Sequence, residues 1–260
     1  MRILYFFVCF LSSIIGAICG IGGGVIIKPV LDATNTFDAV TISFLSGCTV
    51  LAMTSYSVIR AKMTKKKEIS MKSSFPLAVG AAVGGVLGKQ IFSLLIDHVN
   101  NASKVGLVQA ICLLMITVIT FIYTIFKEKI RTKQVAHAAA GIIIGALLGI
   151  MSAFLGIGGG PINIIVLYYF YSLDTKAAAQ NSLFVIFFSQ LLSLVVSIAG
   201  HSVPKIDPML LGIMVIAGIG GGMFGRWLNA RINEKMVSKL FLLAMVVIIV
   251  INVHNIYLFA

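Results

Sequence analysis

The sequence predicts an all-α protein, a polytopic bundle of transmembrane helices made of two homologous halves. Three observations predict this class. Of the 260 residues, 59% are hydrophobic and only 11% are charged, with a mean hydropathy of +1.07, whereas soluble domains carry about 25% charged residues. The apolar residues gather in runs long enough to cross a bilayer, and one glycine-containing segment occurs twice. The chain has too few charges to cover a water-soluble surface, and it is too apolar for intrinsic disorder.

Basic residues separate the apolar runs. The 20 Lys and Arg residues outnumber the 8 Asp and Glu residues, which gives a net charge of +12. Most of them form short clusters between the runs, as orientation signals do, and no nucleic-acid-binding motif occurs, so we expect no nucleic-acid partner. The four cysteines lie inside apolar runs without a C-x-x-C pair, and the four histidines are scattered. We therefore expect no metal site and no cofactor.

Eight stretches with few or no charges follow one another along the chain. A helix needs about 20 residues to cross the ~30 Å hydrocarbon core, and most of the stretches fit one crossing. The stretches are Ile3–Ile27, Ala39–Ile59, Phe75–Ile96, Val105–Phe126, Gln134–Leu173, Ala177–Gly200, Pro208–Gly225 and Leu240–Ala260.

Two stretches are too long for a single crossing. Gln134–Leu173 contains 40 residues, which would extend about 60 Å as one straight helix. Ile3–Leu31 is interrupted only by Lys28. Because each stretch contains a run of glycines, which disfavour a helix, we expect a break in both.

The glycine runs, Gly20–Gly24 and Gly156–Gly160, have the same sequence, G-I-G-G-G. Proline favours the first position of a helix, so a short half-helix is expected to start near Pro161, and its counterpart near Val25.

The two runs belong to an internal repeat. An offset of 136 residues carries the first run onto the second, and it also aligns Asp38 with Asp174 and Ser46 with Ser182. At an offset of 137 residues, one more than before, the G-G-x-x-G-K sequence of Gly84–Lys89 matches G-G-x-x-G-R of Gly221–Arg226. We therefore expect one integral membrane domain of two transmembrane repeats, 1–130 and 131–260, joined by the basic segment 127–133.

The distribution of basic residues favours opposite orientations for the two repeats. If every stretch crosses fully, 12 basic residues face inside and seven face outside. If each glycine-broken segment is a hairpin that enters and leaves on one side, the repeats are inverted, both termini lie outside, and the counts become 15 and four. Lys28 counts as outside in both arrangements. Because basic loops favour the cytoplasm, we expect the inverted repeat, with the cluster Lys65–Lys67 in the cytoplasm.

Paired glycine-interrupted segments at matching repeat positions are typical of the binding site of a secondary transporter. A helix that begins inside the membrane has N–H groups without intrahelical partners, and these groups and the helix dipole favour an anion. The candidate substrate-binding glycines are Gly22, Gly23, Gly24, Gly158, Gly159 and Gly160. The alternative role of a glycine is close helix packing, which we expect for the spacings Gly80/Gly84/Gly88, Gly141/Gly145/Gly149 and Gly218/Gly222.

These motifs carry a resemblance to a known family. The run Gly20–Gly24 followed by Pro29 and Leu31, its second copy and the doubled G-G-x-x-G pattern resemble the TauE/SafE family of membrane permeases over nearly the whole chain. The resemblance implies export or uptake of sulfur-containing anions such as sulfite, sulfoacetate or related organosulfonates. The second copy has Ile165 where the first has Pro29, so the two half-sites need not be equivalent.

Polar residues near the breaks are further candidates. Amides and hydroxyls donate hydrogen bonds to an oxyanion without a fixed countercharge, and an interhelical hydrogen bond is the alternative role of each. These candidates for substrate binding are Asn163, Gln180, Asn181, Ser182, Ser43 and Ser46.

Charged residues at matching repeat positions form a separate group. Lys89 and Arg226 either attract substrate or extend to the membrane interface. Asp38 and Asp174 each precede a span, where helix capping is the expected role and proton coupling the alternative.

We therefore expect a secondary transporter, not an enzyme, for a small anion that is a sulfur oxyanion or organosulfonate such as sulfite or sulfoacetate. Its other partners are the lipid bilayer and a coupling proton or other ion. The protein is expected in the cell membrane as a multi-pass protein, which in a bacterium is the inner membrane. Two alternatives stay open. One is a non-transporting membrane partner or assembly protein. The other is an intramembrane enzyme such as a protease, which needs a nucleophile with a base, although no G-x-S-x-G motif occurs.

Overall fold

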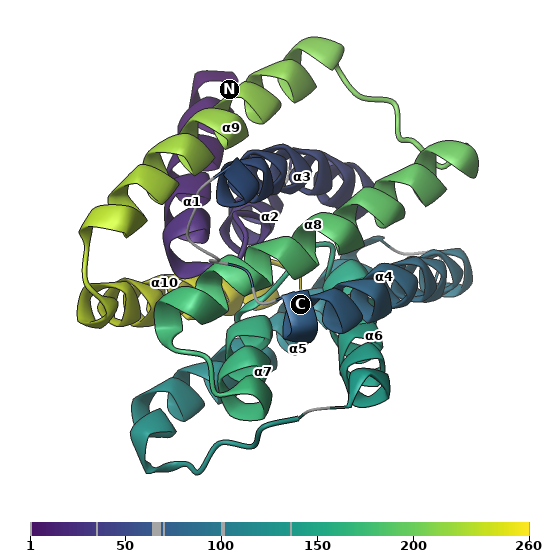
Figure 1. The fold of residues 1–260 in the computed structure, drawn as a ribbon. Helices are drawn as coiled ribbons and strands as arrows, with labels where there is room; N and C mark the ends of the chain where they lie inside the picture. The colour runs from purple at the N-terminus through teal and green to yellow at the C-terminus, as the bar shows by residue number, and fades with distance from the viewer. Residues whose placement is uncertain are drawn as a thin grey trace.

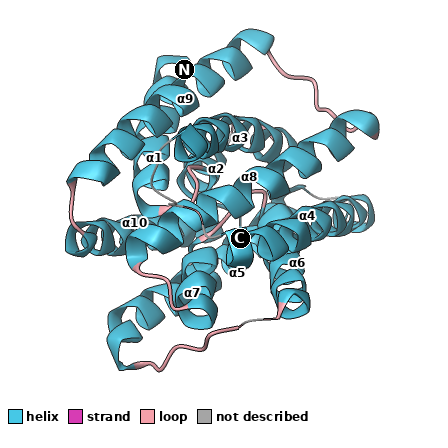
Figure 2. Ribbon diagram, in the orientation of Figure 1, coloured by secondary structure: helices cyan, strands magenta, loops and turns pink. Residues whose placement is uncertain are grey.

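The computed structural model describes residues 2–34, 36–63, 69, 71–99, 102–135 and 137–259. Within these ranges the chain consists of helices joined by loops and has no strand (Figures 1 and 2). Before residue 127 the helices are α1 (Arg2–Cys19), α2 (Gly24–Ala33), α3 (Ala39–Met63), α4 (Met71–Val99) and α5 (Ala102–Phe126). After the short 3-10 helix η1 (Lys127–Lys129) follow α6 (Ala138–Leu155), α7 (Pro161–Tyr171), α8 (Thr175–Ala199), α9 (Pro208–Arg231) and α10 (Glu234–Phe259). The predicted all-α fold class is confirmed.

Eight described helices are long and apolar enough to cross a membrane. Large apolar side chains on their outer faces are exposed, for example Ile143 at 63%, Ile216 at 67% and Val250 at 62%. Surfaces of this kind are stable against lipid and costly against water. The cluster Lys65–Lys67, predicted to be cytoplasmic, lies outside the described residues.

Both glycine runs break the helix where the sequence predicts it. In the first, α1 ends at Cys19 and α2 begins at Gly24; in the second, α6 ends at Leu155 and α7 begins at Pro161. The two half-helices have 10 and 11 residues, which corresponds to about 15 Å of length each. That is half of the hydrocarbon core.

Each broken segment folds back on itself as a helical hairpin. In α1–α2, an ideal Cβ on Gly23 would lie 3.3 Å from the Cα atom of Ser13, and Tyr5 and Leu31 belong to one apolar cluster. In α6–α7, the residues before α6 meet the end of α7, because Lys133 N donates to Tyr169 O at 2.7 Å and Val135 N donates to Phe170 O at 2.8 Å. The two ends of the second hairpin therefore lie side by side.

Glycines outside the breaks allow close helix packing, as predicted. Helix α4 packs against α6, and α1 packs against α9. A methyl group on Gly145 would collide with the carbonyl oxygen of Leu77 on α4. A methyl group on Gly221 would collide with the carbonyl oxygen of Phe10 on α1. Small residues at such contacts let the two backbones approach closely.

The two matching aspartates cap helices, which confirms the expected role. The carboxylate of Asp38 accepts a hydrogen bond from Thr41 N at 3.0 Å at the start of α3. The carboxylate of Asp174 accepts one from Ala177 N at 2.8 Å at the start of α8. Both satisfy an N–H group that the first turn of a helix leaves unpaired.

The assignment of Lys28 to an outside loop is wrong. Lys28 lies within α2, where it is 2% exposed and forms an ion pair with Asp32. In the sequence, a single lysine within an apolar stretch is counted as a loop residue. Its pairing with Asp32 can be recognised only once both residues are known to lie on one helix. Without Lys28, the counts of basic residues become 15 against three for hairpins and 12 against six for full crossings. The inverted orientation of the repeats stays a prediction.

Candidate functional site

Two cavities are lined by residues of helices α3 and α8. One cavity is lined by the start of α3 and the end of α8, and the other by the end of α3 and the start of α8. The two helices therefore run antiparallel, and the cavities lie at opposite ends of the pair.

The first cavity has a volume of about 460 Å³ and is called the Lys89 cavity here. Lys89 lines it from α4, and Ser43 and Gln190 line it from α3 and α8. The cavity reaches Gly156 in the second glycine break. No hydrogen bond or ion pair joins Lys89 to another described residue, so its ammonium group is available to a solute.

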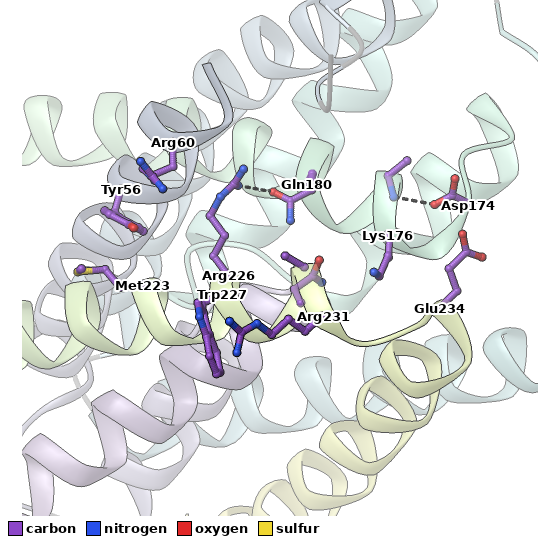
Figure 3. Close-up of a pocket in the computed structure, with 13 residues that line it drawn as sticks. Tyr56, Arg60, Asp174, Lys176, Gln180, Met223, Arg226, Trp227, Arg231 and Glu234 are labelled. Carbon is purple, nitrogen blue, oxygen red and sulfur yellow. Dashed lines mark hydrogen bonds between the residues drawn. The ribbon is translucent and has the colours of Figure 1, made fainter. Parts of the chain in front are cut away.

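The second cavity has a volume of about 720 Å³ and is called the Arg226 cavity. Figure 3 shows Arg226 reaching from α9 toward α8, where its Nη1 atom donates to Gln180 Oε1 at 2.8 Å. The same guanidinium donates to the carbonyl oxygen of Ser57 on α3 at 3.2 Å. Arg226 thus joins three helices at the wall of the cavity.

Repeat-equivalent positions line the two cavities. Lys89 and Arg226 are the matching basic residues of the two G-G-x-x-G motifs, and Phe44 of the first cavity matches Gln180 of the second at the offset of 136. The two cavities are therefore equivalent in the internal repeat, and one lies at each end of the α3/α8 pair.

The two glycine breaks pack against α3, α8 and each other. A methyl group on Gly20 would collide with the backbone of Ala179 on α8, and one on Gly156 would collide with Ser43 on α3. The offset of 136 relates these two contacts, because Ser43 matches Ala179. Gly24 lies against the carbonyl oxygen of Ile157. Each break thus packs on the central helix of the other half.

The breaks leave backbone N–H groups without partners. Among the described residues, the N–H groups of Gly22, Gly23 and Gly24 donate no hydrogen bond, and neither do those of Gly158, Gly159 and Gly160. Gly22 and Gly158 have φ angles of +73° and +70°, a region that favours glycine over residues with a side chain. The start of a helix with free N–H groups is a favourable place for an anion.

Buried hydroxyl and amide groups without partners lie on α3, α7 and α8. Ser46 and Ser182 occupy matching positions on α3 and α8, are 0% exposed, and have hydroxyl groups with no hydrogen-bond partner in the described structure. Ser46 Oγ lies 2.9 Å from the position of an ideal Cβ on Gly24. Asn163, in the first turn of α7, is 4% exposed, and neither its Oδ1 acceptor nor its Nδ2 donor has a hydrogen-bond partner among the described residues. Buried polar groups are normally hydrogen-bonded, so these groups are available to a bound solute.

Two of the predicted polar residues lie elsewhere. Gln180 belongs to the wall of the Arg226 cavity, where it accepts the hydrogen bond from Arg226. Asn181 is 1% exposed, donates to Ala177 O, and accepts a hydrogen bond from Ser74 on α4. Asn181 therefore has the contacts of an interhelical hydrogen bond, the alternative that the sequence left open.

Apolar side chains lie between the two cavities. Val50 and Ile186 match at the offset of 136 and are 0% and 1% exposed. An ideal Cβ on Gly22 would contact both of them, at 3.7 Å and 3.5 Å. Both side chains belong to one small buried apolar cluster, which therefore lies in the middle of the α3/α8 pair beside the first break.

Sequence reasoning missed three polar residues near the breaks. Lys28 and Asp32 form a buried ion pair on α2, and Gln190 lines the Lys89 cavity with its amide near Gly158. The spacing Lys28-x-x-x-Asp32 was the available signal, because residues four apart share a face of a helix. Gln190 has no such signal, since it matches Thr54 in the first half.

Eight apolar spans and irregular backbone buried between them define a multi-pass membrane protein, and paired cavities around broken helices are typical of the transporter class. The profile of the sulfite exporter TauE/SafE family matches residues 5–252, and the chain belongs to this family. It is also similar to the probable membrane transporter protein YunE of Bacillus subtilis (strain 168), with 26% identity over 95% of this chain and 94% of the relative. No solved structure matches the chain. Family membership points to a membrane transporter rather than to an enzyme.

Proposed function

We propose that this protein is a secondary transporter, a permease, for a small anion that is a sulfur oxyanion or organosulfonate such as sulfite or sulfoacetate. One observation carries the proposal: two helix N-termini with unpartnered N–H groups, at Gly22–Gly24 and Gly158–Gly160, begin in the interior beside α3 and α8. N–H groups and the positive end of a helix dipole bind oxyanions of this kind.

The proposed binding site lies between the two breaks. The glycines provide N–H donors close to the solute, because no Cβ stands between the backbone and the anion. Ser46, Ser182 and Asn163 complete the site with hydroxyl and amide groups that have no other partner. The donors at the breaks carry no charge themselves, so they hold an oxyanion less strongly than a permanent countercharge would, and the anion can leave again.

The proposed path follows the two cavities. The anion enters through the Lys89 cavity or the Arg226 cavity, each of which provides one basic side chain, and the contact between Val50 and Ile186 separates them. Because the cavities occupy matching positions, rocking of repeat 1–130 against repeat 131–260 would open one end while closing the other. The direction that this movement serves depends on the gradients across the membrane.

The comparisons support the substrate class and the class of activity. The family is described as that of sulfite exporters, and YunE is described as a probable membrane transporter. The alternative is a non-transporting membrane partner or assembly protein, for which the close glycine packing of α4 on α6 would suffice. It gives no reason for two matching cavities or for unpartnered donors between them.

Two measurements on the purified protein test the proposal. A thermal-shift screen against sulfite, sulfate, thiosulfate, sulfoacetate and acetate identifies the ligand, because a ligand that binds only the folded state raises its stability. Flux into proteoliposomes then separates transport from binding alone. We expect a sulfur anion to stabilise the protein and to cross the bilayer. Stabilisation without flux would favour the non-transporting partner, and the absence of both would contradict the proposed function.

A further inference from the structure

A buried ion pair lies on the first half-helix. Lys28 Nζ is 2.8 Å from Asp32 Oδ2, one helical turn away on α2, and the two side chains are 2% and 11% exposed. Removing two charges from water is costly even when they pair. Ionisable residues at membrane depth are therefore rare, and they mark ion or proton paths by default.

The hairpin fold does not need this pair. At the offset of 136, Lys28 matches Ile164 and Asp32 matches Tyr168. The second hairpin also breaks at a G-I-G-G-G run and continues as a half-helix of similar length, without either charge. Since a glycine break followed by a half-helix forms without the pair, the requirement for the pair lies outside the hairpin fold.

The pair lies directly behind the glycine break of the other half. An ideal Cβ on Gly156 would lie 3.2 Å from Lys28 Cε, and it would collide with Ser43 Oγ. Gly156 and Ser43 both line the Lys89 cavity, and the hydroxyl group of Ser43 has no partner in the described structure. The backbone at Gly156 therefore lies between the side chain of Lys28 and the Lys89 cavity.

We propose that the Lys28–Asp32 pair couples anion binding to the uptake of one proton. This inference rests on the proposed anion transport. In the empty site, the Asp32 carboxylate neutralises the Lys28 ammonium. When a proton from water adds to Asp32 Oδ2, the ion pair is broken, and the ammonium becomes the countercharge for an anion that reaches the second break through the Lys89 cavity, past Ser43 and Gly156. Departure of the anion restores the pair and releases the proton. A monovalent anion is thus carried together with one proton and without net charge.

Few other ionisable groups lie on the helices that pack against the pair. Tyr5 and Cys9 on α1 share an apolar cluster with Ile27 and Leu31 of the half-helix. Helix α3 contributes the hydroxyl groups of Ser43 and Ser46, and Asn255 of α10 donates to Pro29 O. His254 of α10 is exposed. Among the described residues, the other ion pair is Arg2–Asp207, whose side chains are 54% and 43% exposed.

The test uses methanesulfonate, a small organosulfonate whose charge does not change while carboxylates titrate. Its binding and its uptake into proteoliposomes are measured for the whole protein over a range of pH, with and without an imposed proton gradient. We expect wild-type binding to weaken by about tenfold per pH unit above the titration range, and an inward proton gradient to drive uptake.

Three variants separate coupling from folding. Asp32→Asn keeps the shape of the side chain and leaves Lys28 charged, so we expect binding that no longer depends on pH and uptake that no longer responds to the gradient. Asp38→Asn is the matched control, because Asp38 is exposed and asparagine also caps a helix; it should behave as the wild type. The double variant Lys28→Met/Asp32→Leu removes both charges, which proteins often tolerate, and it should fold but bind methanesulfonate at least about tenfold more weakly.

The outcomes distinguish this inference from the function on which it rests. Gradient-driven uptake that survives in Asp32→Asn, or wild-type affinity in the folded double variant, would overturn the coupling role. Wild-type binding and flux without any dependence on pH would overturn it as well, and would leave the proposed transport intact. A wild-type protein that neither binds nor moves methanesulfonate would contradict the proposed substrate class.

Discussion

The two glycine-broken hairpins have the same order of elements and differ in their side chains. Both α1–α2 and α6–α7 turn at a G-I-G-G-G run and continue as a half-helix of 10 or 11 residues. The first half-helix carries the buried ion pair of Lys28 and Asp32, whereas the second has Ile164 and Tyr168 at the matching positions and begins with Pro161. In the function proposed above, the donors for the anion come from the backbone of both breaks, whereas the coupling to a proton belongs to the first hairpin alone.

The cavities show a similar asymmetry. Arg226 is engaged by Gln180 and by the carbonyl oxygen of Ser57, whereas Lys89 has no such partner among the described residues. Each cavity thus keeps one basic residue at a matching position, but the arginine also joins helices. The two copies of the repeat therefore keep a basic residue at the same position, although the contacts of that residue differ between them.

The prediction with the largest effect concerns the orientation of the two halves. If the repeats are inverted, the loop before α9 and the segment after α5 lie on opposite sides of the membrane. In a variant without the native cysteines, an impermeant thiol reagent applied to intact cells should label Lys205→Cys and leave Lys129→Cys unlabelled until the membrane is opened. Both positions are exposed. Labelling of Lys129→Cys alone would reverse the orientation, and labelling of both would contradict the inverted repeat.

The second prediction compares Lys28 with its repeat equivalent. Lys28→Met leaves the Asp32 carboxylate buried without its partner, which costs about 3–5 kcal/mol in folding stability. Ile164→Met, a volume-conserving change at the matching position, should cost less than about 1.5 kcal/mol. Unfolding of both variants in detergent at equal protein concentration measures the difference. Equal stability of the two would show that the ion pair is not maintained in the folded protein.

Much of this fold can be predicted from local sequence signals, whereas the candidate site can be predicted only in part. The glycine runs, Pro161 and the two capping aspartates act on neighbouring residues, so the breaks and helix starts were predictable. Asn181 shows where this reasoning ends, because its partner Ser74 lies 107 residues away. Lys28 was misassigned for the same reason: burial depends on which helices surround a residue, and a linear pattern of charges contains no such information.

The smallest predicted effects separate the two asparagines. Asn181 forms interhelical contacts, so Asn181→Ala should lower stability by about 0.6–1.7 kcal/mol without changing anion affinity. Asn163, at the start of α7, has an Nδ2 group that donates no hydrogen bond to a described residue, so Asn163→Ala should remove a donor to the anion, weaken anion binding and leave stability nearly unchanged. Thermal unfolding with and without sulfite measures both quantities. The reverse assignment of effects would place the anion near Asn181 instead of at the breaks.

The central claim, that backbone groups at the breaks bind the anion, is tested most directly by sulfite binding to Gly160→Ala. Gly160 has an extended φ of −165°, and an ideal Cβ there would contact only Ile157 and Ile162, at 3.4 Å and 4.0 Å. Alanine therefore fits without strain and places a methyl group beside the N–H donors of the second break.

Two alanine controls accompany the measurement. Gly212→Ala, in open space on α9, should resemble the wild type, and Gly145→Ala, which collides with Leu77, should lose about 1–3 kcal/mol of stability. We predict that Gly160→Ala folds as the wild type does and binds sulfite at least about tenfold more weakly. Wild-type affinity in this variant would contradict the account, because the glycines would then serve packing alone.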